Sequence, residues 1–545
     1  ASAFGMAGHA RIGSRFARLL GSLGRKDAPI GPVSDYVRTL QGNGLAHAEV
    51  SVRSASAAAL ARIQSPNAYD RIESAAKGDA SPRVRFHALR AAVALRGDKA
   101  LPLLLDRLAH DADAGVREEA ATVCGKRRLH EALNPLRDAL KDNSWEVRTC
   151  AAVSLGNLRD IKGVNSLGVL YGSKDWRDRG AAVVGLGWIN QKTAVPLLIT
   201  ALRDRDAAVA FTALEFLRHI SGSGLGGKSK LWREWWKNQE KTFVFRDPDA
   251  AAKKAKKYGY AVEPRRVYED LDIVVLQTRR GGDNIQFLLT DYGIDFRIVR
   301  AGSVPKIGLH PYALFVANCP GEITSKDAER IGWYVRAGGY LFASCWALTH
   351  TVGRCFPGIV RQLKTRAQVV DTVQAVPCPS HSPFTEGVFD DVTQPLYELL
   401  GSHLIDVIDP ERFEVLIDSP ETATNWGDGN LAGWFTVGHG VVLDSANHFD
   451  LQGMRNARLR DEKERMAFAV NHLGYDYAAL RELKAEGVFA KQPLAIKRTR
   501  DLSIFRFITT FVRQKRLADD GVQVSLAGKR ELSRPDAAKE AGPGG

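Results

Sequence analysis

The chain has 545 residues, of which 45% are apolar, and it carries 76 lysines and arginines against 62 aspartates and glutamates. That length exceeds what one hydrophobic core accommodates, so two or more domains are expected. The sequence contains no run of about 18 apolar residues and therefore offers no membrane-spanning helix. The formal net charge of +14 suits acidic partners, whether protein, nucleic acid or anionic lipid, but the charge is spread along the chain, so a solvated basic surface is the favoured interpretation.

Six cysteines are present, and no two of them form a C-x-x-C pair. This spacing argues against zinc-ribbon and thioredoxin-like sites, so neither a metal nor a cofactor is predicted. Most of the six lie in apolar runs, which is typical of buried free thiols. The chain begins at Ala1 rather than at a methionine, which leaves an exported, processed form open and the compartment unknown.

Valine–arginine pairs recur every 31 or 32 residues through the amino-terminal half. An alanine or serine follows four positions after the first member of each pair, so small residues fall at helical spacing and neighbouring helices can pack closely. A fixed period of this length predicts one helix pair per unit, stacked into a solenoid. We expect the recurrent arginines to pair with the preceding aspartates of the stack rather than with a ligand. The register is set by Val52, Val84, Val116, Val147, Asp178 and Val209.

This pattern of aspartate, Val-Arg and alanine resembles the short HEAT-like repeats of the phycobilisome-lyase type over residues 46–220. The resemblance implies an α-solenoid of HEAT-like helix pairs that binds protein partners along its concave face. Aspartates and glutamates interrupt the basic positions in every unit. We therefore expect no continuous basic stripe, and nucleic acid is not the favoured partner.

Three tryptophans, Trp232, Trp235 and Trp236, follow the array within five residues. On a helix they could stack nucleobases. The open end of a solenoid needs a cover, however, and we expect this helix to cap the array. The lysine-rich stretch 253–257 that follows is interpreted as a linker.

Strand and helix patterns alternate from residue 267 onward. The expected helices, 284–292 and 324–337, begin at capping residues and end at glycines. Alternation of this kind implies a mostly parallel sheet that is covered on both faces. The expected strands are 272–277, 296–299, 312–317, 340–344 and 441–446.

Cys345 directly follows the strand 340–344 and so lies at the carboxyl edge of the expected sheet. Open α/β sheets place their active sites at this edge. A cysteine on a sharp turn after a strand is held clear of the backbone, as a nucleophile must be. The alternative is a buried small side chain that fills the sheet edge.

The sequence 318–321 (NCPG) follows an expected strand where a Gly-Gly-Pro turn would stand, and 343–347 (ASCWA) stands in place of Gly-x-Cys-x-Gly. Near the end, 448–450 (HFD) stands in place of His-Pro-Glu. Through these motifs the second half resembles the class I glutamine amidotransferase superfold over residues 268–475, and 278–283 (TRRGGD) and 381–384 (HSPF) resemble an uncharacterised bacterial branch of it. The resemblance implies a flavodoxin-like or amidotransferase-like α/β domain with a mostly parallel sheet.

By this matching Cys345 is the nucleophile, His448 the base and Asp450 the orienting acid. The chain departs from the family where alanines replace both glycines around the cysteine and Asn318-Cys319 replaces Gly-Gly. The family's glycines let the backbone approach the substrate and form the oxyanion hole. Because a Cβ crowds both, we expect this domain to bind a small ligand or a protein rather than to hydrolyse a substrate.

Other residues at the expected sheet edge are candidates for ligand binding. A Gly-Gly pair ahead of a helix can hold an anion, but the pair lacks the full dinucleotide fingerprint, so a plain tight turn is the favoured interpretation. The histidines at 350, 381, 439 and 448 show no short metal-ligand spacing, so no metal site is predicted from them. The candidate ligand-binding residues are Gly281, Gly282, Asp283, Asn318, His350 and His439.

The sequence thus predicts five segments. After the α/β domain the chain is expected to be basic and irregular. Its aromatic segment 504–513 is expected to pack back onto one of the two domains, with docking on a membrane surface or on a partner as the alternative. The segments are an amino-terminal stretch (1–45), the HEAT-like solenoid (46–225), a Trp-rich cap and basic linker (226–266), the amidotransferase-like domain (267–480) and a basic extension with a disordered tail (481–545).

The expected function is that of a non-enzymatic scaffold or binding protein. The solenoid would take protein partners, and the degenerate amidotransferase-like domain would take a ligand or a protein. The alternative is a cysteine-dependent hydrolase or amidotransferase-like enzyme that uses Cys345, His448 and Asp450.

Overall fold

The computed structural model divides into two compact units, unit 1 (residues 1–245) and unit 2 (residues 246–545). The stretch 253–257, His381 and the tail beyond residue 532 lie outside the described residues. Within the described part of the chain, no helix is long and apolar enough to cross a membrane. The described residues are 17, 33–245, 268, 271–277, 282–291, 294–365, 367–378, 382–389, 396–448, 485, 494–519, 522–524 and 530–532.

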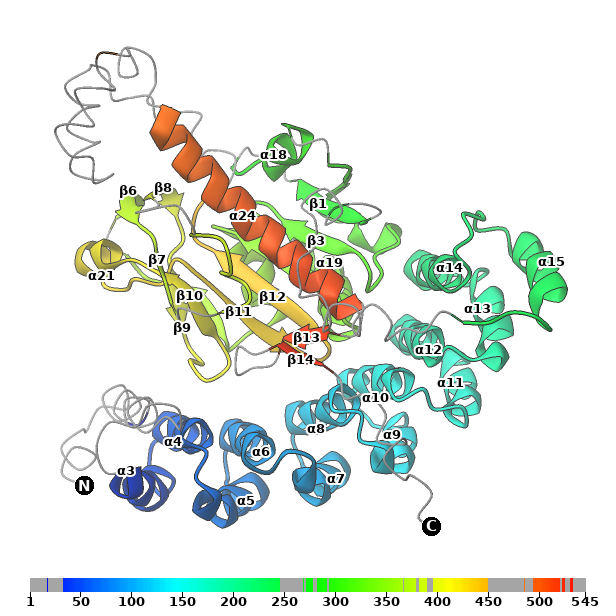
Figure 1. The fold of residues 1–545 in the computed structure, drawn as a ribbon, viewed down its shortest axis with the longest axis horizontal. Coiled ribbons are helices and arrows are strands. Elements are labelled where there is room, and N and C mark those ends of the chain that lie inside the picture. The colour runs from blue at the N-terminus through cyan, green and yellow to red at the C-terminus, as the bar shows by residue number, and fades with distance from the viewer. Residues whose placement is uncertain are drawn as a thin grey trace, which may run out of the picture. The chain divides into compact units, whose positions relative to one another are not determined.

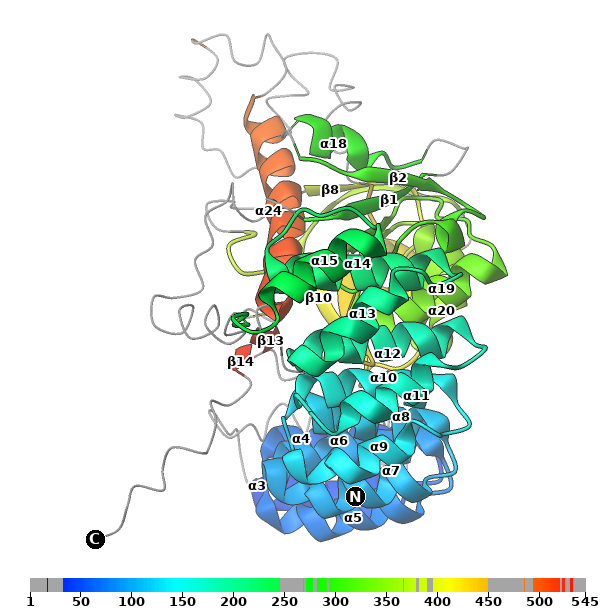
Figure 2. The ribbon, with the colours of Figure 1, turned by 90° about the vertical axis from the view of Figure 1, so that its right-hand side faces the viewer.

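Unit 1 is a stack of helix pairs, as the period predicts, and α3 (Val33–Thr39) precedes it (Figure 1). Figure 2 shows the same stack from a second direction. The first helices of the pairs are α5 (Tyr69–Gly78), α7 (Leu101–His110), α9 (Leu133–Ala139), α11 (Gly163–Tyr171) and α13 (Val195–Ala201). The second helices are α4 (Val50–Ile63), α6 (Pro82–Arg96), α8 (Ala114–Lys126), α10 (Trp145–Asn157), α12 (Trp176–Ile189) and α14 (Ala207–Ser221).

Five of the six second helices begin at a serine or an aspartate, and all six bury the first member of the repeated pair. Four of these N-cap side chains accept a hydrogen bond from a backbone amide of the first turn, which has no carbonyl partner within the helix. The five repeated valines are fully buried and form the core between the stacked helices. The four caps are Asp113, Ser144, Asp175 and Asp206.

The second helices also touch one another directly along the stack. At Gly156 in α10, an added Cβ would lie 2.8 Å from the carbonyl oxygen of Gly185 in α12. Two backbones approach this closely only where a side chain is missing. The small residues of the repeat therefore set the spacing of the array.

The helix α15 (Ser229–Gln239) closes unit 1. Trp232 is fully buried and donates from its indole Nε1 to the carbonyl oxygen of Gly226 at 3.0 Å. Trp236 is also buried, and α15 packs against α13. Two of the three tryptophans are thus part of the core of the array rather than a free stacking surface.

Unit 2 contains a mixed sheet of eight strands in the order β2-β1-β3-β4-β12-β11-β10-β7. The strands β2, β1, β3, β4 and β12 pair in parallel, which confirms the predicted mostly parallel sheet, and β11, β10 and β7 extend it in antiparallel fashion. The bounds are β1 (Ile273–Gln277), β2 (Arg297–Arg300), β3 (Leu314–Ala317), β4 (Tyr340–Ser344), β7 (Val376–Pro377), β10 (Glu414–Asp418), β11 (Ala432–Val437) and β12 (Gly440–Ser445).

Short elements surround this sheet. Two-stranded ladders join β5 to β9, β6 to β8 and β13 to β14. The helices are α18 (Ile285–Asp291), α19 (Ser325–Arg336), α20 (Gly353–Cys355) and α21 (Pro420–Trp426). The additional strands are β5 (Val360–Gln362), β6 (Val369–Gln374), β8 (Leu396–Ser402), β9 (Ile405–Val407), β13 (Val522–Val524) and β14 (Arg530–Leu532).

The helix α19 connects β3 to β4 and begins as the sequence predicts. Thr324 and Asp327 form a reciprocal capping box. The helix is followed by Gly338 at φ = 114°, a backbone conformation that favours glycine. This stop directs the chain into β4 and so fixes where Cys345 emerges.

The carboxy-terminal extension differs from the prediction. Residues 494–519 form one long helix, α24, which crosses the strands of the sheet (Figure 1). Phe507 and Phe511 are buried in the core of unit 2, where the rings of Phe511 and Phe342 lie 5.7 Å apart between centroids. The predicted irregular segment is wrong here because its apolar residues recur at helical spacing. These aromatic side chains are core residues and do not face a membrane.

Candidate functional site

Three loops meet at the carboxyl edge of the parallel strands. The chain leaves β3 through Asn318 and Cys319, leaves β4 at Cys345, and reaches His448 after β12. The strands β3, β4 and β12 are parallel neighbours in this order. Residues that are far apart in the sequence are thereby brought to one edge, as expected for an open α/β sheet.

Cys345 lies on a sharp turn in the left-handed backbone region, with φ = 51°. Non-glycine residues adopt this conformation rarely, and such strain is often found at functional sites. The Cys345 amide donates to the carbonyl oxygen of Ser445 at 2.7 Å, which ties the turn to β12. The turn is therefore held in place by the neighbouring strand.

Two thiols and one imidazole form a compact buried cluster at this edge. One ligand atom each from Cys319, Cys345 and His448 lies within 4.8 Å of the other two. The exposed fractions of these residues are 6%, 0% and 4%, respectively. We call these three residues the Cys2His cluster.

The two thiols of the Cys2His cluster differ in acidity. The hydrogen bond between them lowers the pKa of Cys319; burial opposes this shift, and His448 adds to the lowering through a hydrogen bond and its charge. Burial raises the pKa of Cys345 well above its ordinary value, and the contact with Cys319 raises it further. Of the two thiols, Cys319 is therefore the more readily ionised, and His448, which was predicted to serve Cys345, contributes to lowering the pKa of Cys319.

Two amides that could stabilise an oxyanion near Cys345 are already engaged. The backbone amide of Trp346 is directed at the Cys319 sulfur and helps to lower its pKa. The amide of Cys345 itself is bonded to Ser445. Both amides would have to leave their present partners in order to bind an acyl oxygen.

Two of the predicted ligand-binding residues lie next to Cys319. An added Cβ on Gly282 would lie 2.6 Å from the carbonyl oxygen of Cys319, so the two backbones touch. Asn318 donates from Nδ2 to Oε1 of Gln286 at 2.9 Å, and its Oδ1 is buried with no hydrogen-bond partner in the described residues. Asp283, which follows Gly282, is also buried.

His350 belongs to an aromatic group beside the Cys2His cluster. Trp346 stacks on His403 with ring centroids 4.5 Å apart, and His350 lies 6.2 Å from Trp346 between centroids. Burial, followed by the charge of His350, lowers the pKa of His403 to about 4, which keeps its ring neutral at pH 7. His350 is not one of the three clustered donors.

The remaining predicted residues do not join this site. His439 lies in the turn between β11 and β12, where its amide donates to the carbonyl oxygen of Arg336 at 3.1 Å. That turn is at the opposite end of β12, a strand about 20 Å long at ~3.3 Å per residue. His439 therefore cannot share a ligand with Cys345. Gly281 and Asp450 lie outside the described residues.

Sequence reasoning placed Cys319 in a degenerate turn and did not count it as a site residue. Its signal was present, because Cys319 follows one strand by two positions and Cys345 follows the next strand directly. Parallel neighbours bring such positions together. Whether His448 interacts with Cys319 or with Cys345 depends on side-chain geometry, which the spacing of the residues in the sequence does not reveal.

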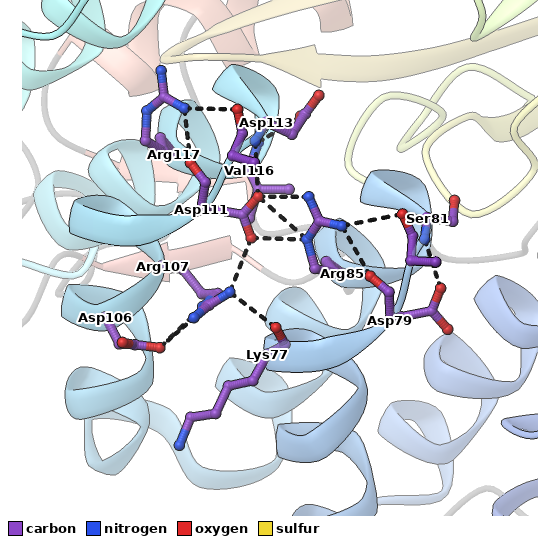
Figure 3. A network of polar contacts seen from close by, with 12 residues as sticks. Lys77, Asp79, Ser81, Arg85, Asp106, Arg107, Asp111, Asp113, Val116 and Arg117 are labelled. Atoms are coloured by element: carbon purple, nitrogen blue, oxygen red, sulfur yellow. Dashed lines mark hydrogen bonds and ion pairs between the residues drawn. The ribbon is translucent and has the colours of Figure 1, made fainter.

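The recurrent arginines of unit 1 form a second set of candidate binding groups, and Figure 3 shows how two of them are used. Arg85 donates from Nη2 to Oδ1 of Asp111 at 2.7 Å and from Nη1 to the carbonyl oxygen of Asp79 at 2.9 Å. Arg117 repeats the arrangement with Asp142 and with the carbonyl oxygen of Asp111. Each arginine thus connects three successive segments of the stack.

This arginine–aspartate ladder corrects the predicted pairing. The expectation was that each arginine binds the preceding aspartate, whereas its side chain binds the carboxylate of the following unit and only the carbonyl groups of the preceding loop. The five arginine side chains are between 7% and 17% exposed. The pairs are Arg53–Asp79, Arg85–Asp111, Arg117–Asp142, Arg148–Asp178 and Arg179–Asp204.

One step of the ladder uses a relocated carboxylate. Ser173 occupies the position of the ladder aspartates, and Asp178 occupies the position of the repeated valines. Arg148 donates from Nε to Oδ1 of Asp178 at 2.8 Å, and the Ser173 hydroxyl donates to Oδ2 of Asp178 at 2.8 Å. The exchanged pair therefore restores the same charge contact from a different place.

The comparisons with known proteins agree with the repeat architecture. Models of HEAT repeats match residues 42–123 and 105–183, and a model of the PBS lyase HEAT-like repeat matches residues 178–204. A search of curated proteins gave no match. The amino-terminal region of the chain thus contains HEAT and PBS lyase HEAT-like repeats.

Solved structures resemble parts of the chain at low identity. The YIBA protein of E. coli is 21% identical with a TM-score of 0.31, over 39% of this chain and 78% of that one. The CpcE–CpcF complex of phycocyanin lyase from Nostoc sp. PCC7120 is 16% identical with a TM-score of 0.23, over 43% and 92%. A β-galactosidase from Rahnella sp. R3 is 15% identical with a TM-score of 0.23, over 33% and 29%.

Proposed function

We propose that the protein is a scaffold or binding protein in which unit 1 takes protein partners and unit 2 holds a ligand or a protein at the carboxyl edge of its sheet. In this proposal unit 2 is a degenerate member of the amidotransferase-like, flavodoxin-like α/β class. HEAT repeats commonly mediate protein interactions, which supports the role of unit 1.

The observation that carries this proposal is the arginine–aspartate ladder. The periodic cations of the array are neutralised by carboxylates and carbonyl groups of the neighbouring units. A nucleic-acid-binding solenoid would need such cations free to contact phosphates. The ladder instead holds the helix pairs in register and keeps these cations from contacting phosphates, which favours a protein partner over nucleic acid.

The second helices supply the proposed binding surface. They touch one another along the stack, whereas the first helices contact mainly their own partner helices, so the second helices lie on the tighter, concave side. Side chains at the last turn of each second helix recur with the period of the repeat. This row is Arg62, Ala94, Lys126, Asn157 and Trp188.

Site-specific photo-crosslinking in the full chain tests this surface. A benzoylphenylalanine at Ala94, which is exposed on α6, is expected to crosslink to protein in the native cell. The matched control is the same residue at Val169, which is 80% exposed on the first helix α11. Crosslinks at Ala94 that consist of nucleic acid, or equal protein crosslinks at both positions, would refute the proposed concave-face partner.

A cysteine-dependent hydrolase is the second candidate, and one specific observation favours it. Cys345 has the left-handed backbone of a nucleophile turn, and His448 lies in the same cluster. If this function is right, the full chain hydrolyses activated esters or amides, and both Cys345→Ala and His448→Ala abolish that activity while Cys378→Ala does not. Activity that survives in Cys345→Ala would exclude it.

A further inference from the structure

The Cys2His cluster offers three donor atoms of the types that bind thiophilic metal ions. Two sulfurs and one imidazole nitrogen converge from three different loops, each anchored to its own strand. Thiolates and imidazole together are the donors that zinc and cuprous copper prefer over magnesium or calcium. The sequence predicted no metal because it has no C-x-x-C pair and because its histidines at 350, 381, 439 and 448 show no short metal-ligand spacing.

The distances permit one ion between the three donors. In tetrahedral coordination with Zn–S about 2.3 Å and Zn–N about 2.0–2.1 Å, the donors lie roughly 3.5–3.8 Å apart. In this structure the three donor atoms all lie within 4.8 Å of one another. Small side-chain rotations therefore suffice to close the site around an ion.

The backbone around the cluster is fixed by contacts that a metal site requires of its supporting residues. The Cys319 amide donates to the Ser344 hydroxyl at 3.2 Å, and the Cys345 amide donates to Ser445 at 2.7 Å. One buried oxygen without a hydrogen-bond partner in the described residues also occurs here, Oδ1 of Asn318, which is next to Cys319. Such an oxygen is suited to an additional ligand or a metal-bound water.

We propose that Cys319, Cys345 and His448 bind a single Zn²⁺ ion, a site that deepens and rests on the proposal that this sheet edge binds a ligand. Two thiolates balance the charge of a divalent ion, so the loaded site is neutral, as burial demands. Three protein donors leave one coordination position open, the arrangement of zinc sites that also hold water or a substrate. Cuprous copper shares the donor preference and is distinguished by the test.

Metal analysis of the full-length, reduced protein tests the site. After loading with Zn²⁺ and gel filtration, the protein is expected to retain one zinc per chain. The variants Cys319→Ser, Cys345→Ser and His448→Ala each lose it. Cys378→Ser, which changes a thiol outside the cluster, retains it. Zinc retained equally by the three cluster variants is adventitious and overturns the proposal.

A spectroscopic measurement on the unaltered chain guards against variants that fail to fold. Cobalt(II) bound at this site gives thiolate-to-metal charge-transfer absorption, and X-ray absorption at the zinc edge reports two sulfurs and at least one nitrogen. Absence of sulfur from the coordination shell overturns the site. Retention of Cu⁺ but not Zn²⁺ by the same residues overturns the assignment to zinc.

The metal analysis and the crosslinking experiment can succeed or fail independently, because the first reports on unit 2 and the crosslinking at Ala94 reports on unit 1 alone. Retained zinc together with absent protein crosslinks would keep the metal site and remove the partner on the concave face. Crosslinks with no retained zinc would do the reverse.

Discussion

Asp178→Val and Ser173→Asp are each expected to weaken the ladder contact of Arg148. The double variant, which moves the carboxylate from position 178 to position 173, is expected to restore that contact. In Asp178→Val, Arg148 loses its only ladder carboxylate but keeps the carbonyl groups of Asp142 and Asn143. Loss of this charged contact at side chains that are 17% and 9% exposed costs about 3 kcal/mol, and the buried valine returns about 1 kcal/mol. The net destabilisation of unit 1 is therefore about 2 kcal/mol.

The other single variant, Ser173→Asp, is expected to be destabilised for a different reason. Ser173→Asp removes the hydroxyl that donates to Asp178 and places a second carboxylate beside it, at a cost of about 1 kcal/mol. In the double variant the aspartate and the valine occupy the positions found in the other units. The double variant is expected within ~0.5 kcal/mol of the wild type, which gives a coupling energy of about 2–3 kcal/mol.

Thermal unfolding of the full chain measures these changes, and hydrogen exchange in peptides from α10 and α12 assigns the transition to unit 1. A loss of 2 kcal/mol corresponds to a fall in Tm of roughly 4–8 °C for a unit of this size. Lys230→Met, which removes an exposed ion pair of 3.9 Å, is the control and should change stability by less than ~0.5 kcal/mol. Additive single and double effects would refute the exchanged-pair account.

Three further predictions concern acid, the array spacing and the long helix. Burial acts to raise the pKa of the ladder carboxyls Asp111, Asp142 and Asp204, but hydrogen bonds from their arginines and from backbone amides lower it overall. The stability that these groups contribute is therefore present above about pH 4 and is lost as the pH falls through the pKa of the folded state. Measuring Tm as a function of pH in the acid range checks this. Gly156→Ala should destabilise unit 1 by about 1–3 kcal/mol in denaturant unfolding, because its Cβ would meet the Gly185 carbonyl. Phe511→Ala should destabilise unit 2 by about 3–5 kcal/mol, and an unchanged unfolding midpoint would show that α24 is not part of the core.

The architecture was predictable where local patterns repeat. The period of the Val-Arg pairs predicted the helix stack, and the alternation of apolar runs with capped helices predicted a mostly parallel sheet. The direction of the ladder was not predictable, because the preceding aspartate is much nearer in the sequence, 6 residues from Arg85 against 26 for the following one, and yet it is the following carboxylate that Arg85 binds. The packing of the helices determines that the Arg85 guanidinium binds the carboxylate of Asp111 and, in Asp79, the backbone carbonyl oxygen.

The site was predictable only in part for the same reason. Strand ends placed Cys345 and His448 at one edge of the sheet. The role of Cys319 depends on the direction of the Trp346 amide and on the histidine, which are properties of the folded loops. The apolar residues of α24 recur at helical spacing, so the helix itself was predictable; its packing on the sheet was not, because its partners there lie far away in the sequence.

The labelling rate of Cys345 in the metal-free, native full chain tests the central claim that this residue is not an activated nucleophile. Its side chain is fully buried, whereas Cys378 is partly exposed. With iodoacetamide at neutral pH, read by peptide mass spectrometry, we predict that Cys345 reacts more slowly than Cys378 and that His448→Ala leaves its rate unchanged. Selective, rapid labelling of Cys345 that disappears in His448→Ala would contradict this account and establish a hydrolase-type thiol.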